Sequence, residues 1–368
     1  MRIALDMEPA IGNIDGIGTY VKGLVQGLIN TQNDLEIVPI YGCLPSAKEM
    51  WCPESSAIKK RTTLMPHRCY DYLINRGFPI ELSSGFVDIV HWPNCSSWRS
   101  HKAKIVVTIH DLVFIERPDL YDEETLLHYN ALMEYTFEHA DHLIANSQHT
   151  ANAISMHYDW PDSKISYVHL GGSEIANENI DGIKLPFDAQ KYILAIGSHT
   201  IRKNYHTLVK AFAEVRDHTP DLKLVIIGKS TPNTQFLLDA CSRLGLQDHI
   251  IWLGYASNEL KAALIKSAAC VVNTSWHEGF GIPLVEAMSC GTPVICSNVA
   301  ACPEITDDAA ILCDPADPSS FASAILRILT DNSTADILRT KGLNRSRIFT
   351  WEACAKGTRD IYEKVLLV

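Results

Sequence analysis

Two glutamates, Glu278 and Glu286, stand at either end of a glycine-containing apolar run in the segment 277–287, HEGFGIPLVEA. Carboxylates accept hydrogen bonds from hydroxyl groups, so this pair suits a ligand rich in hydroxyls. GFG (279–281) lets main-chain N–H groups come close to a ligand, and Pro283 suits the first turn of a helix, whose N-terminus favours phosphate. The combination predicts a nucleotide-sugar site. In isolation, two such glutamates are more often a first-turn helix residue and a solvated side chain.

A basic pair, Arg202 and Lys203, follows the apolar run KYILAIG (191–197) and precedes a segment with helical periodicity, YHTLVKAFAEV (205–215). Guanidinium and ammonium groups both bind phosphate well. In isolation such a pair is more often a solvated part of a loop. Its position after a strand-like run makes it a second candidate for phosphate binding.

In the first half of the chain, His110 directly follows the run KIVVTI, and Asp111 after it could orient the imidazole or cap the next segment. A lone histidine in this position is more often a structural group. DGIGTY (15–20) places Gly16 and Gly18 before an apolar helix, where their backbone could approach a phosphate or a sugar, although a simple turn is the commoner interpretation. The spacing Gly-x-Gly-x-x-Gly is absent, which counts against nicotinamide chemistry.

These residues must be positioned by apolar, β-branched runs that alternate with helix-length segments in both halves of the chain. The runs span 2–7, 35–40, 87–91, 104–109 and 142–145 in the first half, and 191–197, 223–228, 250–254, 269–273 and 293–297 in the second. The pattern predicts an α/β fold with two doubly wound parallel-sheet domains, whose ligands bind beyond the carboxyl ends of the strands. Weaker candidates at such ends are His91, Trp92, Asn94, Lys229, Gly254 and Tyr255.

The polar stretch 173–190 contains glycine and proline and has no clear periodicity, so it predicts a linker with a domain boundary near residue 185. We expect one domain over 1–185 and a second over 186–350, followed by a C-terminal helix over 351–368.

Lys and Arg number 32 against 43 Asp and Glu, a net charge of −11, which argues against a nucleic-acid partner bound through many phosphates. No window approaches the ~18 uninterrupted apolar residues of a membrane span, and the N-terminus lacks a signal-peptide pattern, so we expect a cytoplasmic protein. The 11 cysteines include no Cys-x-x-Cys motif, which argues against a disulfide framework and a zinc site.

The stretch VVNTSWHEGFGIPLVEAMSCGTPVICS (271–297) resembles the Glu-x7-Glu signature of the retaining glycosyltransferases of family 4, whose fold is GT-B. The similarity extends through GSHTIRKN and WLGYASNEL in the C-terminal half and, more loosely, through GIGTYV and IHDL in the N-terminal half. It implies two Rossmann-like domains that face a cleft, with nucleotide-sugar bound by 186–350. The resemblance also implies that 351–368 crosses back to the acceptor-side domain, 1–185.

The resemblance assigns roles to individual residues. Glu286 would hold the ribose hydroxyls of the donor nucleotide, and Glu278 would lie near the hydroxyls and the reacting face of the donor sugar. Arg202 and Lys203 would bind the donor pyrophosphate, although Ser198 stands where many family members have an arginine. The remaining assignments are the backbone of Phe280, Gly281 and Ile282 facing the sugar and pyrophosphate, Gly16 and Gly18 facing the donor phosphates and the acceptor, His110 near the donor sugar, Tyr255 at the nucleobase and Lys229 as a donor contact.

The implied reaction is the retaining transfer of a hexose from a nucleotide-sugar to a glycan or a lipid-linked saccharide. The Arg-Lys-Asn form of the basic loop looks like that of bacterial mannosyltransferases of polysaccharide assembly, which favours GDP-mannose as donor and leaves UDP-sugars open. No Asp-x-Asp motif follows a strand, so we expect no metal and no other cofactor. A GT-B sugar-nucleotide epimerase is an alternative. A phosphorylase would need a far longer chain, and a periplasmic sugar-binding protein would need an export signal.

A lipid-linked acceptor would bring the protein to a membrane. The segment 59–76 could form an amphipathic helix on the inner face of the cell membrane, or a surface helix with a solvated charged face. Its charged residues are Lys59, Lys60, Arg61, Arg68 and Arg76 against Asp71.

Overall fold

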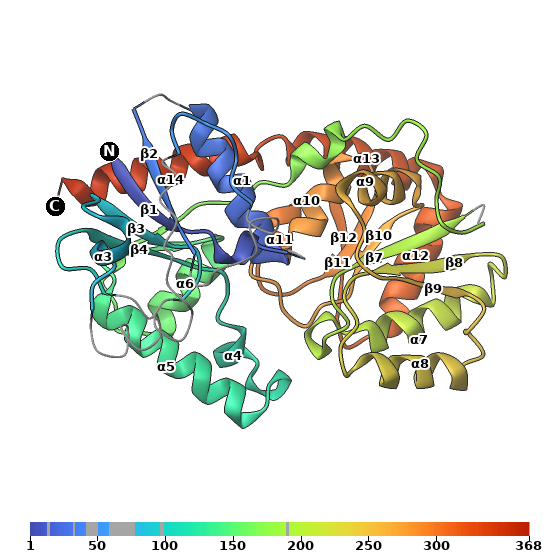
Figure 1. Cartoon of the computed structure of the whole chain (residues 1–368). Helices are drawn as coiled ribbons and strands as arrows, with labels where there is room; N and C mark the ends of the chain where they lie inside the picture. The colour runs from blue at the N-terminus through green and yellow to red at the C-terminus, as the bar shows by residue number, and fades with distance from the viewer. Residues whose placement is uncertain are drawn as a thin grey trace. The chain divides into compact units, whose positions relative to one another are not determined.

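The computed structural model describes residues 1–12, 15–31, 34–41, 51–58, 78–95, 99–188 and 191–367. Its contacts form two compact units, Met1–Gly171 together with Trp351–Val368, and Gly172–Thr350. Each unit is built from one sheet with helices packed on it (Figure 1). The segment 59–76, the candidate for membrane contact, lies outside the described residues. Within the described ranges, no helix is both long and apolar enough to cross a membrane.

A parallel six-stranded sheet forms the centre of the first unit, with the strand order β2-β1-β3-β4-β5-β6. Its strands are β1 (Arg2–Asp6), β2 (Glu36–Ile40), β3 (Ile89–Trp92), β4 (Lys104–Ile109), β5 (His142–Ala145) and β6 (Ile165–Tyr167). The helices in the described part of this unit are α1 (Gly16–Thr31), α3 (Glu81–Ser84), α4 (Val113–Glu116), α5 (Glu123–His139), α6 (Gln148–His157) and α14 (Trp351–Leu366), with short turns η1 (Glu8–Ala10), η2 (Pro118–Leu120) and η3 (Asp162–Lys164). Because helices cover both faces of a parallel sheet, its strands are continuous apolar runs, and in β4 every residue after the first is buried.

The second unit is centred on another parallel six-stranded sheet, with the order β12-β11-β10-β7-β8-β9. Its strands are β7 (Tyr192–Ile196), β8 (Lys223–Ile227), β9 (Ile250–Leu253), β10 (Val271–Asn273), β11 (Val294–Ser297) and β12 (Ala310–Cys313). Its helices and turns are η4 (Ser173–Asn177), η5 (Ile201–Lys203), α7 (Tyr205–Arg216), α8 (Thr234–Arg243), α9 (Asn258–Ser267), α10 (Ile282–Ser289), α11 (Cys302–Thr306), α12 (Pro318–Thr330) and α13 (Asn332–Ser346). The chain runs outward from β7 to β9 and then returns to place β10 beside β7. The predicted fold class, two parallel sheets with helices, is therefore confirmed.

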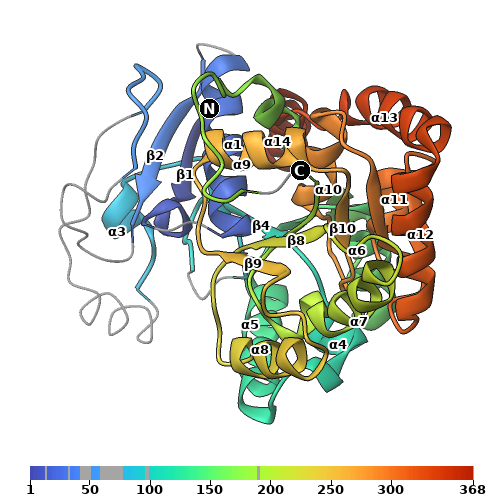
Figure 2. The same cartoon turned by 90° about the vertical axis from the view of Figure 1, so that its right-hand side faces the viewer.

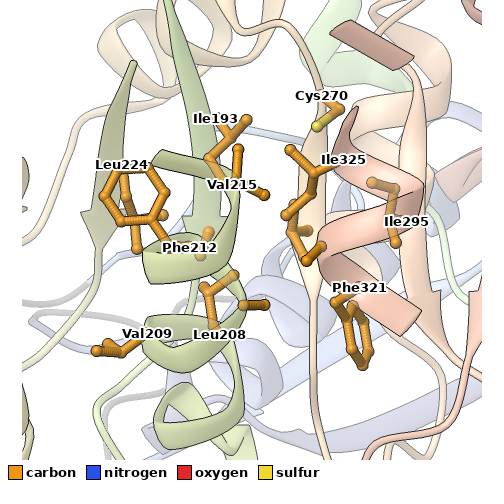
Figure 3. Packing of buried hydrophobic residues seen from close by; sticks show 14 of the residues in the cluster. Ile193, Leu208, Val209, Phe212, Val215, Leu224, Cys270, Ile295, Phe321 and Ile325 are labelled. Carbon is orange, nitrogen blue, oxygen red and sulfur yellow. The ribbon is translucent and has the colours of Figure 1, made fainter. Parts of the chain in front are cut away.

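The core of the second unit lies where α7 and α12 pack side by side on the sheet (Figure 3). Phe212 and Val215 of α7, together with Phe321 and Ile325 of α12, are fully buried, as is Ile193 of β7 beneath them. Burial of one such side chain contributes roughly 1.5–3 kcal/mol. This packing holds rigid the sheet edge from which the loops after β7 and β10 emerge.

The contacts divide the chain at 171/172, whereas the composition of the linker suggested a boundary near residue 185. The reason is that η4 packs with the second unit, where Lys266 Nζ donates a hydrogen bond to the carbonyl oxygen of Ala176 at 2.8 Å. The polar segment after η4 therefore follows the domain boundary rather than forming it.

Helix α14 lies alongside α1 in the first unit (Figures 1 and 2). The two helices approach closely because Gly23 of α1 has no side chain: a Cβ atom there would overlap the indole ring of Trp351. The same holds for Gly171, at the end of the first stretch of this unit. The Trp351 ring thus fills a socket that only glycine leaves open, and this fixes the start of α14.

Candidate active site

The loops that follow β7 and β10 leave the second sheet at its topological switch point, where open α/β sheets bind ligands. After β7 the chain forms the turn η5 (Ile201–Lys203), and after β10 it runs to Glu278 before α10 begins. The two loops are joined directly, because the backbone N–H of Trp276 donates to the carbonyl oxygen of Arg202 at 2.8 Å. The second sheet therefore brings the predicted basic pair and the first glutamate of the motif to one place.

Glu278 is the centre of a buried cluster of charges. Its Oε1 atom lies 2.6 Å from Lys203 Nζ and accepts hydrogen bonds from Ser275 Oγ at 2.6 Å and from Asn273 Nδ2 at 3.1 Å. Its Oε2 atom accepts from Arg202 Nη1 at 2.9 Å. Glu278 is only 5% exposed and Lys203 only 9%. Three donors thus reach Oε1 and one reaches Oε2, and each carboxylate oxygen offers about two acceptor positions.

The opposite charges in this cluster keep each other ionised although burial favours the neutral forms. Burial alone would raise the pKa of Glu278, but the Lys203 and Arg202 cations and the hydrogen bonds from Lys203 and Ser275 hold it well below its ordinary value. Burial lowers the pKa of Lys203, and the Glu278 carboxylate opposes that shift. With Glu278 ionised and both bases protonated, two cations face one carboxylate. The cluster keeps one net positive charge that an anionic ligand could meet.

The backbone around the cluster is shaped to admit Lys203. Gly197, at the end of β7, has a φ of +143°, and a Cβ atom there would lie 2.7 Å from Lys203 Cε. Glycine is therefore required where the lysine stem crosses the strand end. Arg202 is held separately, since its Nη1 atom also donates to the carbonyl oxygen of His277 at 2.8 Å.

Glu286, the second glutamate of the motif, lies on α10 and is also buried, with 4% of its surface exposed. Its Oε1 atom forms an ion pair with Lys261 Nζ of α9 at 2.5 Å. Nothing in the sequence around Lys261 marks it as a site residue, because its pairing with Glu286 arises from the packing of α9 beside α10. It is a residue that the sequence analysis missed, as are Asn273 and Ser275, which stand within the resembling stretch.

The N-terminus of α10 comes directly after the loop that carries Glu278. No side chain caps it, and Gly281 before it adopts the left-handed conformation with a φ of +92°. A Cβ atom at Gly281 would lie 2.9 Å from Leu284 Cδ1, so glycine is required for both reasons. The Phe280 side chain turns into the core, edge-on to the Phe349 ring at 5.7 Å, which leaves the backbone of Phe280 to Ile282 as the part that could face a ligand.

Lys229 and Tyr255 follow β8 and β9, the two strands next to β7 on one side. Both are exposed, Tyr255 by 61%, and within the described part of the chain no residue pairs with the Lys229 ammonium. The loop that carries Lys229 is anchored to the loop after β7, because His199 N donates to the Lys229 carbonyl oxygen at 2.9 Å. Their side chains are available to a ligand at that edge of the sheet.

In the first unit, His110 follows β4 and is partly buried. One ring nitrogen, Nε2, lies 2.7 Å from the carbonyl oxygen of Pro93; because a carbonyl only accepts, Nε2 carries the proton of the neutral ring and Nδ1 keeps a lone pair. Burial lowers the pKa of His110, and the hydrogen bond to Pro93 and the charges of Asp111 and Asp15 oppose that shift. Asp111 accepts from Val113 N at 3.3 Å, so it caps the next segment.

Gly16 and Gly18 lie in the first turn of α1. The carboxylate of Asp15 accepts hydrogen bonds from the backbone N–H groups of Ile17 at 3.0 Å and Gly18 at 3.1 Å. An aspartate before a helix is a favoured cap, and here it occupies the amide of Gly18. A phosphate would have to displace this carboxylate to bind the same amide.

His91 and Trp92 belong to strand β3 itself and lie in the interior, so they do not line an open pocket as the sequence suggested. Both ring nitrogens of His91 are within hydrogen-bond distance of neighbouring hydroxyls. Of the three candidates in this stretch, Asn94 is exposed beyond the strand end.

Comparison with known families matches both halves of the chain. Residues 14–171 match the model described as Glycosyltransferase Family 4, and residues 177–345 match the model described as Glycosyl transferases group 1. The O-antigen chain mannosyltransferase B of Escherichia coli is 28% identical over 99% of this chain and 100% of its own length.

Solved structures share the fold over the whole chain. Sucrose-phosphate synthase from Thermosynechococcus elongatus superposes with a TM-score of 0.78 at 21% identity, covering 100% of this chain and 99% of its own. Anabaena HepE, solved in complex with UDP and glucose, has a TM-score of 0.73 at 15% identity over 99% of this chain and 100% of its own. With two GT-B-like sheets, an intact Glu-x7-Glu motif and family matches along both halves, the protein is a glycosyltransferase that belongs to family 4.

Proposed function

We propose that the protein transfers mannose from GDP-mannose to a glycan or a lipid-linked saccharide, with retention of anomeric configuration. The observation that carries this proposal is the buried cluster of Arg202, Lys203 and Glu278, which keeps a net positive charge beside the uncapped N-terminus of α10. A nucleoside diphosphate leaving group needs such a site. The mannosyltransferase name of the Escherichia coli relative supports the choice of sugar.

The donor contacts divide between the cluster and its neighbours. Arg202 and Lys203 take up the charge of the diphosphate, aided by the amides at the start of α10, which is electrostatic stabilisation prepared in advance of the reaction. Glu286 accepts the ribose hydroxyls, and Lys261 holds its carboxylate in place. The exposed side chains of Lys229 and Tyr255 contact the nucleotide from the loops after β8 and β9.

We assign Glu278 chiefly to holding the two cations. Its Oε1 atom already accepts from three donors and its Oε2 atom from one, so a contact with the donor sugar would fall on Oε2. The same occupancy disfavours Glu278 as a covalent nucleophile, because attack would require both ion pairs to break while the sugar carbon gains positive charge. Same-face attack needs no such change. In it the bond from the anomeric carbon to phosphate breaks, the acceptor oxygen bonds that carbon, and the acceptor proton passes to the leaving phosphate.

His110 is our candidate for the acceptor-side group in the first unit. Its Nε2–H is committed to the carbonyl oxygen of Pro93, which leaves the Nδ1 lone pair for a hydroxyl of substrate. The burial that lowers its pKa keeps the ring neutral at pH 7 and so able to accept a hydrogen bond. Gly16 lies in an open position at the start of α1 and is the glycine of that loop that remains available to a ligand.

The choice of nucleotide is tested by isothermal titration with GDP and UDP. We expect GDP to bind at least tenfold more tightly and Glu286→Gln to weaken GDP about 10- to 100-fold, since a hydrogen bond to a charged group contributes about 1.5–3 kcal/mol. The exposed Glu214, changed to Gln, is the matched control and should leave binding unaltered. If UDP binds more tightly than GDP, the donor is a UDP-sugar and not GDP-mannose. This alternative is supported by HepE, whose crystal structure contains UDP.

Turnover is measured as GDP release from GDP-mannose, with the sugar recovered by chromatography. Mannose transferred to acceptor or water supports the transferase, and an epimerised nucleotide-sugar would support the epimerase instead. Because Arg202, Lys203 and the α10 amides supply positive charge, we expect the rate to stay within about twofold after treatment with EDTA. A loss of rate that Mg²⁺ or Mn²⁺ restores would show that a metal takes part.

We also retain the proposal that residues 59–76 touch the inner face of a membrane, supported by five basic residues against one acid in that stretch. Binding to anionic vesicles should weaken when Lys59, Lys60 and Arg61 are neutralised. Equal binding by the altered protein would remove this segment from the account.

A further inference from the structure

A row of four hydrogen-bonding side chains crosses the interior of the first unit. Tyr362 Oη of α14 lies 2.6 Å from His91 Nδ1 of β3, and His91 Nε2 lies 2.8 Å from Thr108 Oγ1 of β4. Thr108 Oγ1 in turn lies 2.9 Å from Tyr20 Oη of α1. None of the four side chains is more than 1% exposed. The row therefore links the C-terminal helix, two strands and the first helix without access to water.

The protons in this row can be counted. Burial, and to a lesser degree His110, lowers the pKa of His91 to about 3, so the imidazole is neutral at pH 7 and carries one N–H. The two ring nitrogens of His91 then have opposite roles, because one donates to its neighbouring hydroxyl and the other accepts from its own neighbour. Thr108 can donate to Tyr20 or accept from it, since a hydroxyl offers one donor and two acceptor positions. Removing the Tyr362 hydroxyl leaves His91 Nδ1 buried without a hydrogen-bond partner.

The row is connected to His110 by one ring contact and by the strands β3 and β4. The Tyr20 ring stands edge-on to the His110 ring, with centroids 5.1 Å apart and an interplanar angle of 79°. Thr108 lies on β4, two residues before His110, which follows that strand. Pro93, whose carbonyl oxygen receives the His110 Nε2–H, follows His91 by two residues at the end of β3. Any change in the pitch of Tyr20, or in the spacing of β3 and β4 at this point, would move the imidazole.

The start of α14 is fixed independently. The Trp351 ring fills the socket left by Gly23 and Gly171, and it lies beside the Tyr20 ring with centroids 6.5 Å apart. Helix α14 is thus held at Trp351 by packing and at Tyr362 by a hydrogen bond, and both contacts lead to Tyr20. A helix that served only to cover the sheet would have no need of a buried hydroxyl at Tyr362, where a phenyl ring could fill the space.

We infer that Tyr362 is a positioning residue for the transfer reaction: through His91, Thr108 and Tyr20, its hydroxyl sets the orientation of His110. This inference rests on the proposed role of His110 in the first unit. It adds the C-terminal helix to the set of elements that determine the rate, although α14 supplies no group to the substrate.

The test compares two buried tyrosines whose hydroxyls have different hydrogen-bond partners, His91 for Tyr362 and the Leu264 carbonyl for Tyr192. In Tyr362→Phe we expect kcat to fall about tenfold while the KM for GDP-mannose stays within twofold, since the donor contacts belong to the second unit. The control is Tyr192→Phe, which removes another buried hydroxyl, hydrogen-bonded to the Leu264 carbonyl oxygen at 2.7 Å in the second unit. It should lose stability to a similar extent and keep its kcat.

A second pair of variants keeps the test decisive if Tyr362→Phe does not fold. Thr108→Val removes the middle hydroxyl and should lower kcat to a similar degree, and Thr108→Ser, which keeps that hydroxyl, should restore most of it. Equal rates for Thr108→Ser and Thr108→Val, or an unchanged kcat in Tyr362→Phe, would overturn the inference.

The proposed function has a separate readout, His110→Gln, measured in the same assay. If His110→Gln is slow while Tyr362→Phe has the normal kcat, the positioning role alone is wrong. If His110→Gln turns over at the normal rate, the role proposed for His110 is wrong, and the inference built on it is wrong too. Nitrogen-15 shifts of the His91 and His110 rings add a direct measure, because Tyr362→Phe should change both and Tyr192→Phe neither.

Discussion

Replacing Glu278 by glutamine should lower kcat by about a hundredfold or more and destabilise the second unit by about 3–5 kcal/mol. Glutamine is close in shape but carries no charge, so Lys203, only 9% exposed, would be left buried without its carboxylate. Burial already lowers the pKa of Lys203, and the loss of the Glu278 charge would lower it further. A lysine without its proton no longer stabilises a departing diphosphate.

Both effects can be measured separately. Turnover is followed as GDP release at saturating donor, and stability by unfolding the protein in denaturant. Glu214→Gln, an exposed glutamate in the same unit, is the matched control. A double-mutant cycle with Lys203→Met should give a coupling energy of about 1 kcal/mol or more, since contacting charges couple within about 0.5–3 kcal/mol. Additive losses would contradict the pairing.

The pH dependence of this ion cluster has a defined sign. The folded-state pKa of Glu278 lies below the ordinary value of 4.5, so its contribution to stability is present above that pH and is lost as the pH falls further. Glu278→Gln should therefore differ from the natural protein most at neutral pH and converge with it in acid.

Acidification should also destabilise the first unit through His91. This effect should begin at a higher pH than the loss of stability that protonation of Glu278 causes. The folded-state pKa of His91 is about 3 against an ordinary value of 6.5, so between these values the unfolded chain binds a proton that the folded one does not. His91 thus supports stability fully above pH 6.5 and progressively less below it. At about 1.36 kcal/mol per pH unit, the loss is about 2 kcal/mol at pH 5 and would reach about 4–5 kcal/mol near pH 3.

The measurement is the unfolding free energy of the protein at several values between pH 8 and pH 5, compared with that of His91→Gln. The variant will be less stable at every pH, because it disturbs Tyr362 and Thr108, but its slope against pH should be shallower by up to one proton. Two other histidines of this unit, His110 and His142, also have lowered pKa values and contribute the slope that remains. Identical slopes would mean that His91 takes up its proton at the same pH in the folded and the unfolded protein.

The sheets were predictable from sequence because parallel strands are buried on both faces and appear as continuous apolar runs. The strands that escaped prediction, β6 (Ile165–Tyr167) and β12 (Ala310–Cys313), are short and lie at sheet edges, where one side lacks a neighbouring strand. β6 has no fully buried residue and β12 only one, so neither carries the apolar signal of a central strand.

The candidate site was predictable where its residues are consecutive or share a motif. Arg202, Lys203 and Glu278 all follow strands, and the switch point between β7 and β10 brings them together. The sequence did not predict that neighbouring side chains donate hydrogen bonds to the Glu278 carboxylate, because these contacts depend on distances between two loops. The Lys261–Glu286 pair depends likewise on the packing of two helices. The interior location of His91 could not be predicted either, because it depends on where α14 packs against the sheet.

The glycine socket that receives Trp351 has a consequence for how the chain is made. The first unit is discontinuous: the ribosome must synthesise all of Gly172–Thr350 before the helix that completes it emerges. At about 5–20 residues per second, that interval is roughly 10–40 s, during which α1 is exposed at the position that Trp351 later covers. The second unit is encoded without interruption and is therefore complete before the first, whose last helix is made at the end of the chain.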